Sequence, residues 1–143
     1  MDRGTYALII DMDADKTIAV GKLGVFNFPK GYYIYIGSAL GGLTARVNRY
    51  LRPLKRMHWH IDYLLQAARI VEVWSITCDE RLECGWYQSA RELPTARDIV
   101  SGFGSSDCSC PSHLLHLKAK PSFNLFRKKL EERGLVCDGI RFI

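Results

Sequence analysis

The sequence predicts an α+β fold with a small, mostly antiparallel sheet flanked by helices. Strand-like segments joined by short polar turns come first, and apolar residues then recur at helical spacing. The chain has 143 residues, of which 48% are hydrophobic, so it is long enough to bury one core. We therefore expect a single domain that spans residues 1–143.

Three segments near the start of the chain have the composition of strands. They cover residues 4–12, 17–26 and 31–37, and each is rich in β-branched or aromatic side chains. Polar or glycine-containing stretches separate the segments, which favours an antiparallel meander. Tyr6 lies on one face of the first strand.

The third strand is the segment on which the expected site depends. Alternation with a period of two places Tyr33, Tyr35 and Gly37 on one face and Ile34 and Ile36 on the other. We expect the isoleucine face to be core. The opposite face then presents phenol hydroxyls beside a glycine, where a ligand can approach the backbone closely.

A helix is expected after this strand, because apolar residues recur there at helical spacing. Its apolar stripe consists of Leu43, Val47, Leu51 and Leu54. Its polar faces carry Arg46, Arg49, Arg52 and Lys55. Pro53 breaks the helix, and a second helix begins near Met57. On that second helix we expect His58 or His60 to lie near the site.

Strands and helices continue to alternate through the rest of the chain. The further strands are expected at residues 70–77, 113–117 and 140–143. A capping box at residues 77–80 predicts a helix that runs to Leu93 and carries Glu83 on the flank of its apolar stripe. The last helix is expected to begin at Pro121-Ser122 and to end at Gly134.

Two tripeptides and a helical arginine resemble the pattern of a known superfamily. Gly4-Thr5-Tyr6, Tyr35-Ile36-Gly37 and Arg46 are similar to the motifs of the GIY-YIG endonucleases, with Thr5 in place of the usual isoleucine. The tripeptides lie further apart in this chain than in the typical member. With Trp-His-Ile-Asp-Tyr-Leu at residues 59–64 and Gly-Phe-Gly-Ser-Ser-Asp-Cys at residues 102–108, the chain looks like a small, uncharacterised prokaryotic branch. In that branch the domain is sometimes joined to endonuclease III.

The resemblance implies a set of catalytic residues. Glu83 corresponds to the glutamate that holds one Mg²⁺ or Mn²⁺, and Arg46 corresponds to the arginine that steadies the phosphate. Tyr6 and Tyr35 correspond to the paired tyrosines that orient or deprotonate the attacking water. Hydrolysis of a phosphodiester needs a base, a cation and usually a metal ion, and this set supplies each of them.

Two positions depart from the pattern of the superfamily. Tyr50 stands where many members have a histidine, and the late asparagine is missing, with Ser105, Ser106 or Asp107 as its expected replacement. The expected supporting residues are Gly37, Ser38, Tyr50, His60, Ser106 and Asp107. The expected phosphate-positioning surface consists of Arg49, Arg52, Lys55 and Arg56.

Charge and cysteine content add weaker constraints. The net charge of +5 and the sequence pI near 9.0 fit an anionic partner, with nucleic acid the first candidate. The five cysteines are an odd number in a chain without an evident export signal, so we expect reduced thiols. An alternative use of Cys108, Cys110 and His113 is a zinc site, because thiolates and imidazole suit that metal.

The sequence thus favours an enzyme, a metal-dependent endonuclease that acts in DNA repair. One alternative is a DNA-binding accessory of base-excision repair that does not cut, working beside an endonuclease III-type enzyme. Another alternative is a small zinc-binding protein. No apolar run approaches the length of a membrane helix, so we expect a cytoplasmic protein without a membrane partner.

Overall fold

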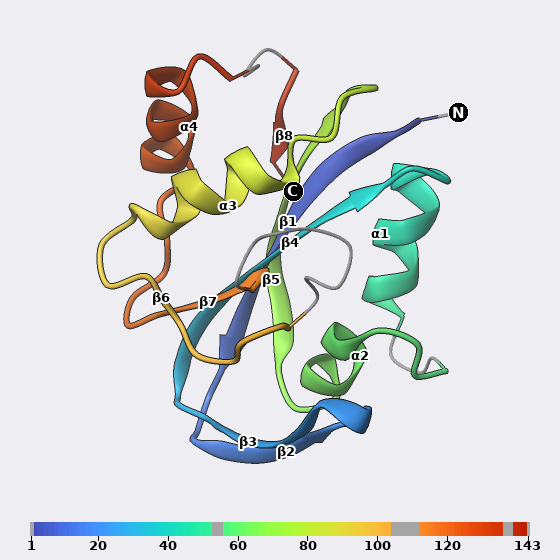
Figure 1. Cartoon of the computed structure of the whole chain (residues 1–143), viewed down its shortest axis with the longest axis vertical. Coiled ribbons are helices and arrows are strands. Elements are labelled where there is room, and N and C mark those ends of the chain that lie inside the picture. The colour runs from blue at the N-terminus through green and yellow to red at the C-terminus, as the bar shows by residue number, and fades with distance from the viewer. Residues whose placement is uncertain (1, 53–55, 104–111, 136–138, 143) are drawn as a thin grey trace.

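The fold is built around one sheet of six strands (Figure 1). The computed structural model describes residues 2–52, 56–103, 112–135 and 139–142. The strands of the sheet are β1 (Gly4–Met12), β4 (Gly31–Ala39), β5 (Arg69–Thr77), β6 (Arg97–Asp98), β7 (Leu114–Leu117) and β8 (Arg141–Phe142). Their order is β6-β7-β4-β1-β5-β8, and every neighbouring pair is antiparallel. The predicted α+β class with an antiparallel sheet is therefore confirmed.

A second, two-stranded sheet lies apart from the first. It consists of β2 (Lys16–Val20) and β3 (Gly24–Phe28), which are joined by a short 3-10 turn, η1 (Gly21–Leu23). The prediction of one strand over residues 17–26 is wrong, because Gly21 and Gly24 have positive φ angles of 48° and 128° and reverse the chain there. The meander is wrong as well, since β4 pairs directly with β1.

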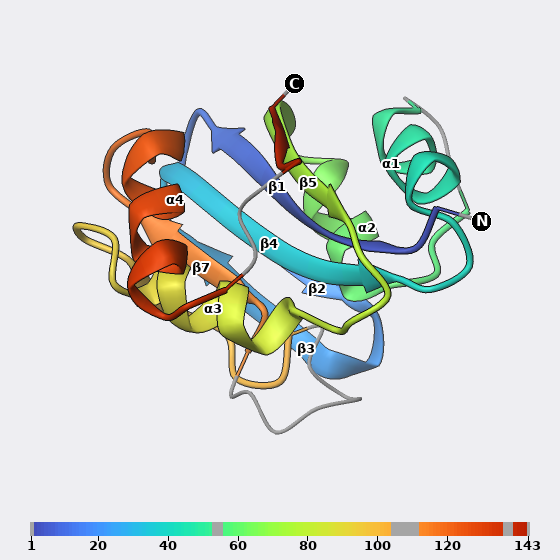
Figure 2. The same ribbon diagram turned by 90° about the horizontal axis from the view of Figure 1, so that it is seen from above.

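Helices cover both faces of the large sheet (Figure 2). The helices are α1 (Leu43–Leu51), α2 (His60–Leu65), α3 (Glu83–Arg91) and α4 (Phe123–Glu132). One apolar cluster joins β1 and β4 to α1, α2 and the hairpin, and a second cluster joins the opposite face of the sheet to α3 and α4. Tyr33 and Tyr35 are therefore buried like Ile34 and Ile36, so the expectation that only the isoleucine face is core is wrong.

The boundaries of three helices differ from their predictions. Helix α3 begins at Glu83, because Thr77 belongs to β5 and pairs with Gly4 instead of capping a helix. Helix α2 begins at His60 and not near Met57. In α1 the buried stripe ends on Tyr50, while Leu51 is 52% exposed.

The C-terminal elements agree with the prediction. Helix α4 follows Ser122, whose side chain accepts a hydrogen bond of 3.2 Å from the Leu125 N–H, as an N-cap does. Gly134 follows the helix with a φ of 70°, which glycine adopts without strain. The short strands β7 and β8 lie within the predicted segments, whereas β6 is an addition. None of the helices in the described part of the chain has the length and apolar character to cross a bilayer.

Candidate active site

A cleft of about 440 Å³ lies beside the start of β1 and the end of β4. Tyr6, Tyr35, Arg46 and Glu83 all line it, so the structure brings together the four residues that the sequence proposes as catalytic. Six of the other expected residues also line this cleft: Gly37, Ser38, Tyr50, His58, His60 and His113. Pro53, Lys55, Ser105, Ser106, Asp107, Cys108 and Cys110 lie outside the described residues.

The cleft lies beside the end of β4 that extends beyond its pairing with β7. Strand β7 pairs with β4 only over residues 32–35, and the Ile36 N–H then donates to the carbonyl of His113 at 3.0 Å. Gly37 and Ser38 continue beyond that point, so the described part of the chain gives them no neighbouring strand on this side. Because β7 does not extend to this end of β4, Tyr6 from one face of the sheet and Glu83 from α3 on the other face reach the same cavity.

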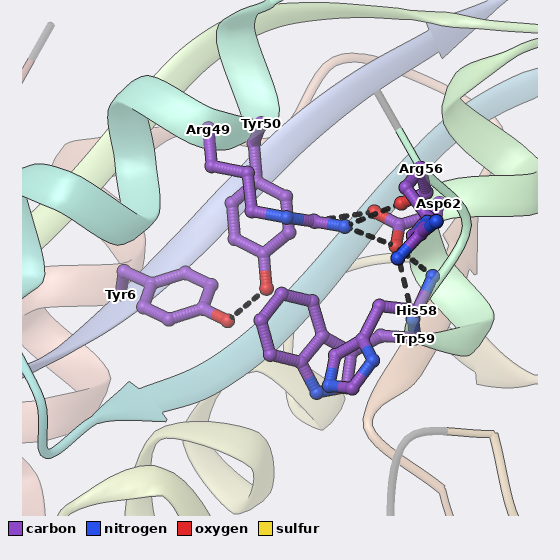
Figure 3. Close-up of polar contacts among 7 residues, drawn as sticks. All are labelled: Tyr6, Arg49, Tyr50, Arg56, His58, Trp59 and Asp62. Carbon is purple, nitrogen blue, oxygen red and sulfur yellow. Dashed lines mark hydrogen bonds and ion pairs between the residues drawn. The ribbon is translucent and has the colours of Figure 1, made fainter.

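Two phenol groups meet at the floor of the cleft. The hydroxyls of Tyr6 and Tyr50 are 2.6 Å apart and share a hydrogen bond (Figure 3). Tyr35 lies beside them, with its ring centroid 6.4 Å from that of Tyr6. Tyr50 therefore orients the Tyr6 hydroxyl.

The environment of these phenols keeps them protonated. Burial, together with the neighbouring Tyr35 and Tyr50, raises the pKa of Tyr6 well above its ordinary value. Burial is also the main reason that the pKa values of Tyr35 and Tyr50 are raised. At neutral pH these groups are hydrogen-bond donors, which favours orientation of a water molecule over its deprotonation by a phenolate.

Gly37 makes room for the Tyr6 ring. A Cβ atom at this position would lie 2.4 Å from the Tyr6 Oη and 2.6 Å from its Cζ. Both separations are far below ordinary van der Waals contact. The glycine of the Tyr35-Ile36-Gly37 tripeptide thus lets one tyrosine pack across the strand that carries the other.

Arg46 is a half-buried cation beside these phenols. Its Nη1 lies 3.4 Å from the carbonyl oxygen of Ser38, and its guanidinium carbon lies 4.4 Å from the centre of the Trp59 ring. Burial alone lowers the pKa of Arg46, but the Tyr6 and Tyr50 phenols raise it, and the net shift is upward. Within the described residues Arg46 forms no ion pair with a carboxylate, which leaves its charge available to an anion.

Arg49 is engaged differently. Its two terminal nitrogens each lie 2.8 Å from a carboxylate oxygen of the fully buried Asp62, and one of them also donates to the Arg56 carbonyl at 2.8 Å (Figure 3). The structure therefore places Arg49 in an ion pair instead of on an open phosphate-binding surface. Arg52 and Arg56 are exposed, as that surface requires.

Glu83 is the carboxylate of the cleft. It is the first residue of α3, where the N-terminal end of the helix dipole favours a negative charge. The residue is only 6% exposed, and its carboxylate pairs with Arg81. Sequence reasoning missed Arg81, although it stands only two positions before the expected metal ligand.

Mg²⁺, Mn²⁺ and Zn²⁺ are the metals expected from the sequence, and they require different protein ligands. No group of three or more histidine, cysteine, aspartate or glutamate side chains gathers in the part of the chain that the structure describes. Glu83, the one carboxylate among the described residues of the cleft, fits Mg²⁺ or Mn²⁺, since Mg²⁺ keeps several waters and takes few protein ligands. Of the expected zinc ligands only His113 is described, so the zinc site stays a prediction. Neither Cys78 nor Cys84 takes part in a disulfide within the described part of the chain.

Three histidines complete the lining of the cleft. They are His58, His60 and His113. Burial lowers the pKa of His60 from its ordinary value of 6.5, so its imidazole is neutral at pH 7. Trp59, between the first two, was absent from the expected site residues, although its place between two histidines is visible in the sequence.

Comparison with known proteins gives one match. A family model described as "Domain of unknown function DUF123" covers residues 5–135. The chain belongs to the DUF123 family. No curated protein and no solved structure matches it. The matched region of this DUF123 domain includes every described residue that lines the cleft.

Proposed function

We propose that this DUF123 domain is a divalent-metal-dependent endonuclease of the GIY-YIG type that hydrolyses phosphodiester bonds in nucleic acids. The observation that carries the proposal is the convergence of Arg46, Tyr6, Tyr35 and Glu83 on one cleft. The cleft holds a cation that has no carboxylate partner among the described residues, oriented hydroxyl donors and a carboxylate that can bind a metal ion. This combination serves attack on a phosphodiester better than it serves a neutral substrate.

Arg46 binds the scissile phosphate in this proposal. A guanidinium offers two donors in a fork that matches two phosphate oxygens, and a half-buried charge is less screened than one on the open surface. As the phosphorus becomes five-coordinate, negative charge grows on the oxygens that Arg46 contacts. A preorganised cation at that place stabilises the transition state more than the ground state.

Glu83 would hold the metal ion, which would neutralise charge on the leaving oxygen. The phenols of Tyr6 and Tyr35 position the attacking water by hydrogen bonding, because their raised pKa values keep them protonated. The imidazole of His60 is the candidate proton acceptor in the cleft, because burial lowers its pKa and leaves it unprotonated at neutral pH.

The wider surface fits a polyanionic substrate. The net charge is +5, and exposed Arg52 and Arg56 flank the helix that carries Arg46. Such residues add affinity without base preference, and each phosphate they neutralise adds to the salt dependence of binding. The resemblance to the fused prokaryotic branch supports DNA repair as the setting and an endonuclease III-type enzyme as the partner.

The test is nicking of supercoiled plasmid in Mg²⁺ or Mn²⁺ by the wild type, Glu83→Gln and Arg46→Ala. We expect the wild type to nick, Glu83→Gln to lose nearly all activity and Arg46→Ala to lose about 100-fold or more in kcat. The matched controls are Glu131→Gln and Arg127→Ala on α4, neither of which lines the cleft, and both should cut normally.

Two results would contradict the endonuclease proposal. Nicking that persists in Glu83→Gln would remove Glu83 as the metal ligand. Salt-sensitive DNA binding by a wild type that does not cut would instead support the accessory that binds without cleavage.

A further inference from the structure

We propose that Trp59 is a positioning residue for Arg46 and that the buried pair Asp62–Arg49 holds Trp59 in place. This inference rests on the proposed function, because it concerns the cation assigned to the scissile phosphate. Neither Trp59 nor Asp62 is among the residues that the GIY-YIG resemblance assigns to catalysis. Trp59 is the N-cap residue of α2, and Asp62 lies in the first turn of that helix.

The Trp59 indole contacts two cations. The guanidinium carbons of Arg46 and Arg49 each lie 4.4 Å from the centre of its ring. An aromatic face attracts a cation at this distance, most strongly when the aromatic group is tryptophan. The indole therefore limits where the Arg46 side chain can lie, and a long side chain held in one rotamer loses less entropy when phosphate binds.

One buried carboxylate fixes the Trp59 backbone and the second guanidinium together. The Asp62 carboxylate accepts hydrogen bonds from the backbone N–H groups of His58 and Trp59, at 2.8 and 2.9 Å. It also accepts two hydrogen bonds from the Arg49 guanidinium, each at 2.8 Å (Figure 3). Its side chain is fully buried, so each bond is made in a medium that screens charge poorly. Asp62 thus links the segment before α2 to helix α1.

The two guanidinium groups beside Trp59 differ in their charge compensation. Asp62 neutralises Arg49, whereas Arg46 has no carboxylate partner in the described part of the chain. Two adjacent bare guanidinium groups would repel each other and weaken the hold of the indole on both. Because one of them is compensated, Trp59 can hold the other close to the Tyr6 and Tyr50 hydroxyls while its charge faces the cleft.

A double-mutant cycle between positions 59 and 46 tests the inference. We expect Trp59→Leu to lower the kcat for plasmid nicking about tenfold and to reduce the salt slope of DNA binding, measured by fluorescence anisotropy in EDTA, by about one. Trp59→Phe, which keeps an aromatic face, should retain most of the wild-type kcat and most of the wild-type salt slope. In the Arg46→Ala background, Trp59→Leu should change neither quantity further.

A control separates positioning from general destabilisation. Phe126→Leu disturbs the core on the opposite face of the sheet, and it should lower the thermal midpoint without changing the salt slope. An equal effect of Trp59→Leu with and without Arg46 would overturn the inference.

The binding measurement also keeps this inference distinct from the proposed function. If the wild type binds DNA without cutting it, the endonuclease proposal fails. The double-mutant cycle measured by DNA binding still tests the role of Trp59. If the wild type neither cuts nor binds, both proposals fail.

Discussion

Gly37→Ala should displace the Tyr6 ring while leaving strand β4 in place. The added Cβ would lie 2.4 Å from the Tyr6 Oη and 2.6 Å from its Cζ. Ordinary contact begins near 3.4 Å, so the ring must move by roughly 1 Å. The backbone itself can accept the substitution, because φ at residue 37 is not positive and a strand favours alanine over glycine.

The expected loss of stability follows from three contributions. Forcing an extra methyl group into a packed site costs about 1–3 kcal/mol, and loss of the Tyr6–Tyr50 hydrogen bond costs about 0.5–1.5 kcal/mol. Replacing glycine in a strand returns about 0.5–1 kcal/mol. The net expectation is a decrease of about 2 kcal/mol in the free energy of unfolding. A displacement of this size at a catalytic hydroxyl should also lower kcat on the order of 100-fold.

Urea unfolding and plasmid nicking measure these two effects. Gly41→Ala is the matched control, because no atom lies within 4 Å of a Cβ added there. It should change the free energy of unfolding by less than about 0.5 kcal/mol. Tyr6→Ala removes the obstacle, so the loss caused by Gly37→Ala should largely vanish in the double variant. Normal stability and normal nicking in Gly37→Ala alone would refute the role assigned to this glycine.

Three further predictions concern stability. Ser122→Ala removes the N-cap of α4 and should lower the urea-derived free energy of unfolding by about 1 kcal/mol, whereas an unchanged midpoint would argue against the cap. Tyr50→Phe removes the hydrogen bond to Tyr6 and should lower the free energy of unfolding by about 1 kcal/mol in the same assay. An unchanged free energy of unfolding would show that this hydrogen bond does not stabilise the fold. Burial opposes ionisation of Asp62, but Arg49 and two backbone N–H groups lower its pKa below 3.8 on balance. The contribution of the Asp62 carboxylate to stability is therefore complete above pH 3.8 and is lost as pH falls through its lowered folded-state pKa. The difference in free energy of unfolding between wild type and Asp62→Asn should consequently narrow in acid. A difference that stays constant with pH would contradict the lowered pKa.

Period-two alternation predicted strands β1 and β4, and the superfamily resemblance implied that four side chains converge on one cleft. Alternation in β1 and β4 is a local property, and the resemblance related their tyrosines to Arg46 and Glu83. The hairpin of β2 and β3 was missed because glycine within a β-rich run can be either part of a strand or a turn, and only the observed φ of Gly21 decides.

Other misses arose from partners distant in sequence. Thr77 has the pattern of a helix cap, but pairing with Gly4 holds it in β5, and this tertiary contact outweighs the local signal. Arg49 resembled an exposed phosphate contact because the sequence does not show that Asp62 is buried and requires a counter-ion. Arg81 and Trp59 were missed for the same reason, since their roles depend on geometry that no local pattern encodes.

The central position of β1 has a consequence for how the domain loses its site on heating. This strand hydrogen-bonds to β4 on one side and to β5 on the other, and it carries Tyr6. Amides in such a strand exchange with deuterated solvent only through the largest unfolding events. The tyrosine floor should therefore survive fraying of the peripheral elements, and its disappearance should coincide with cooperative melting of the whole domain.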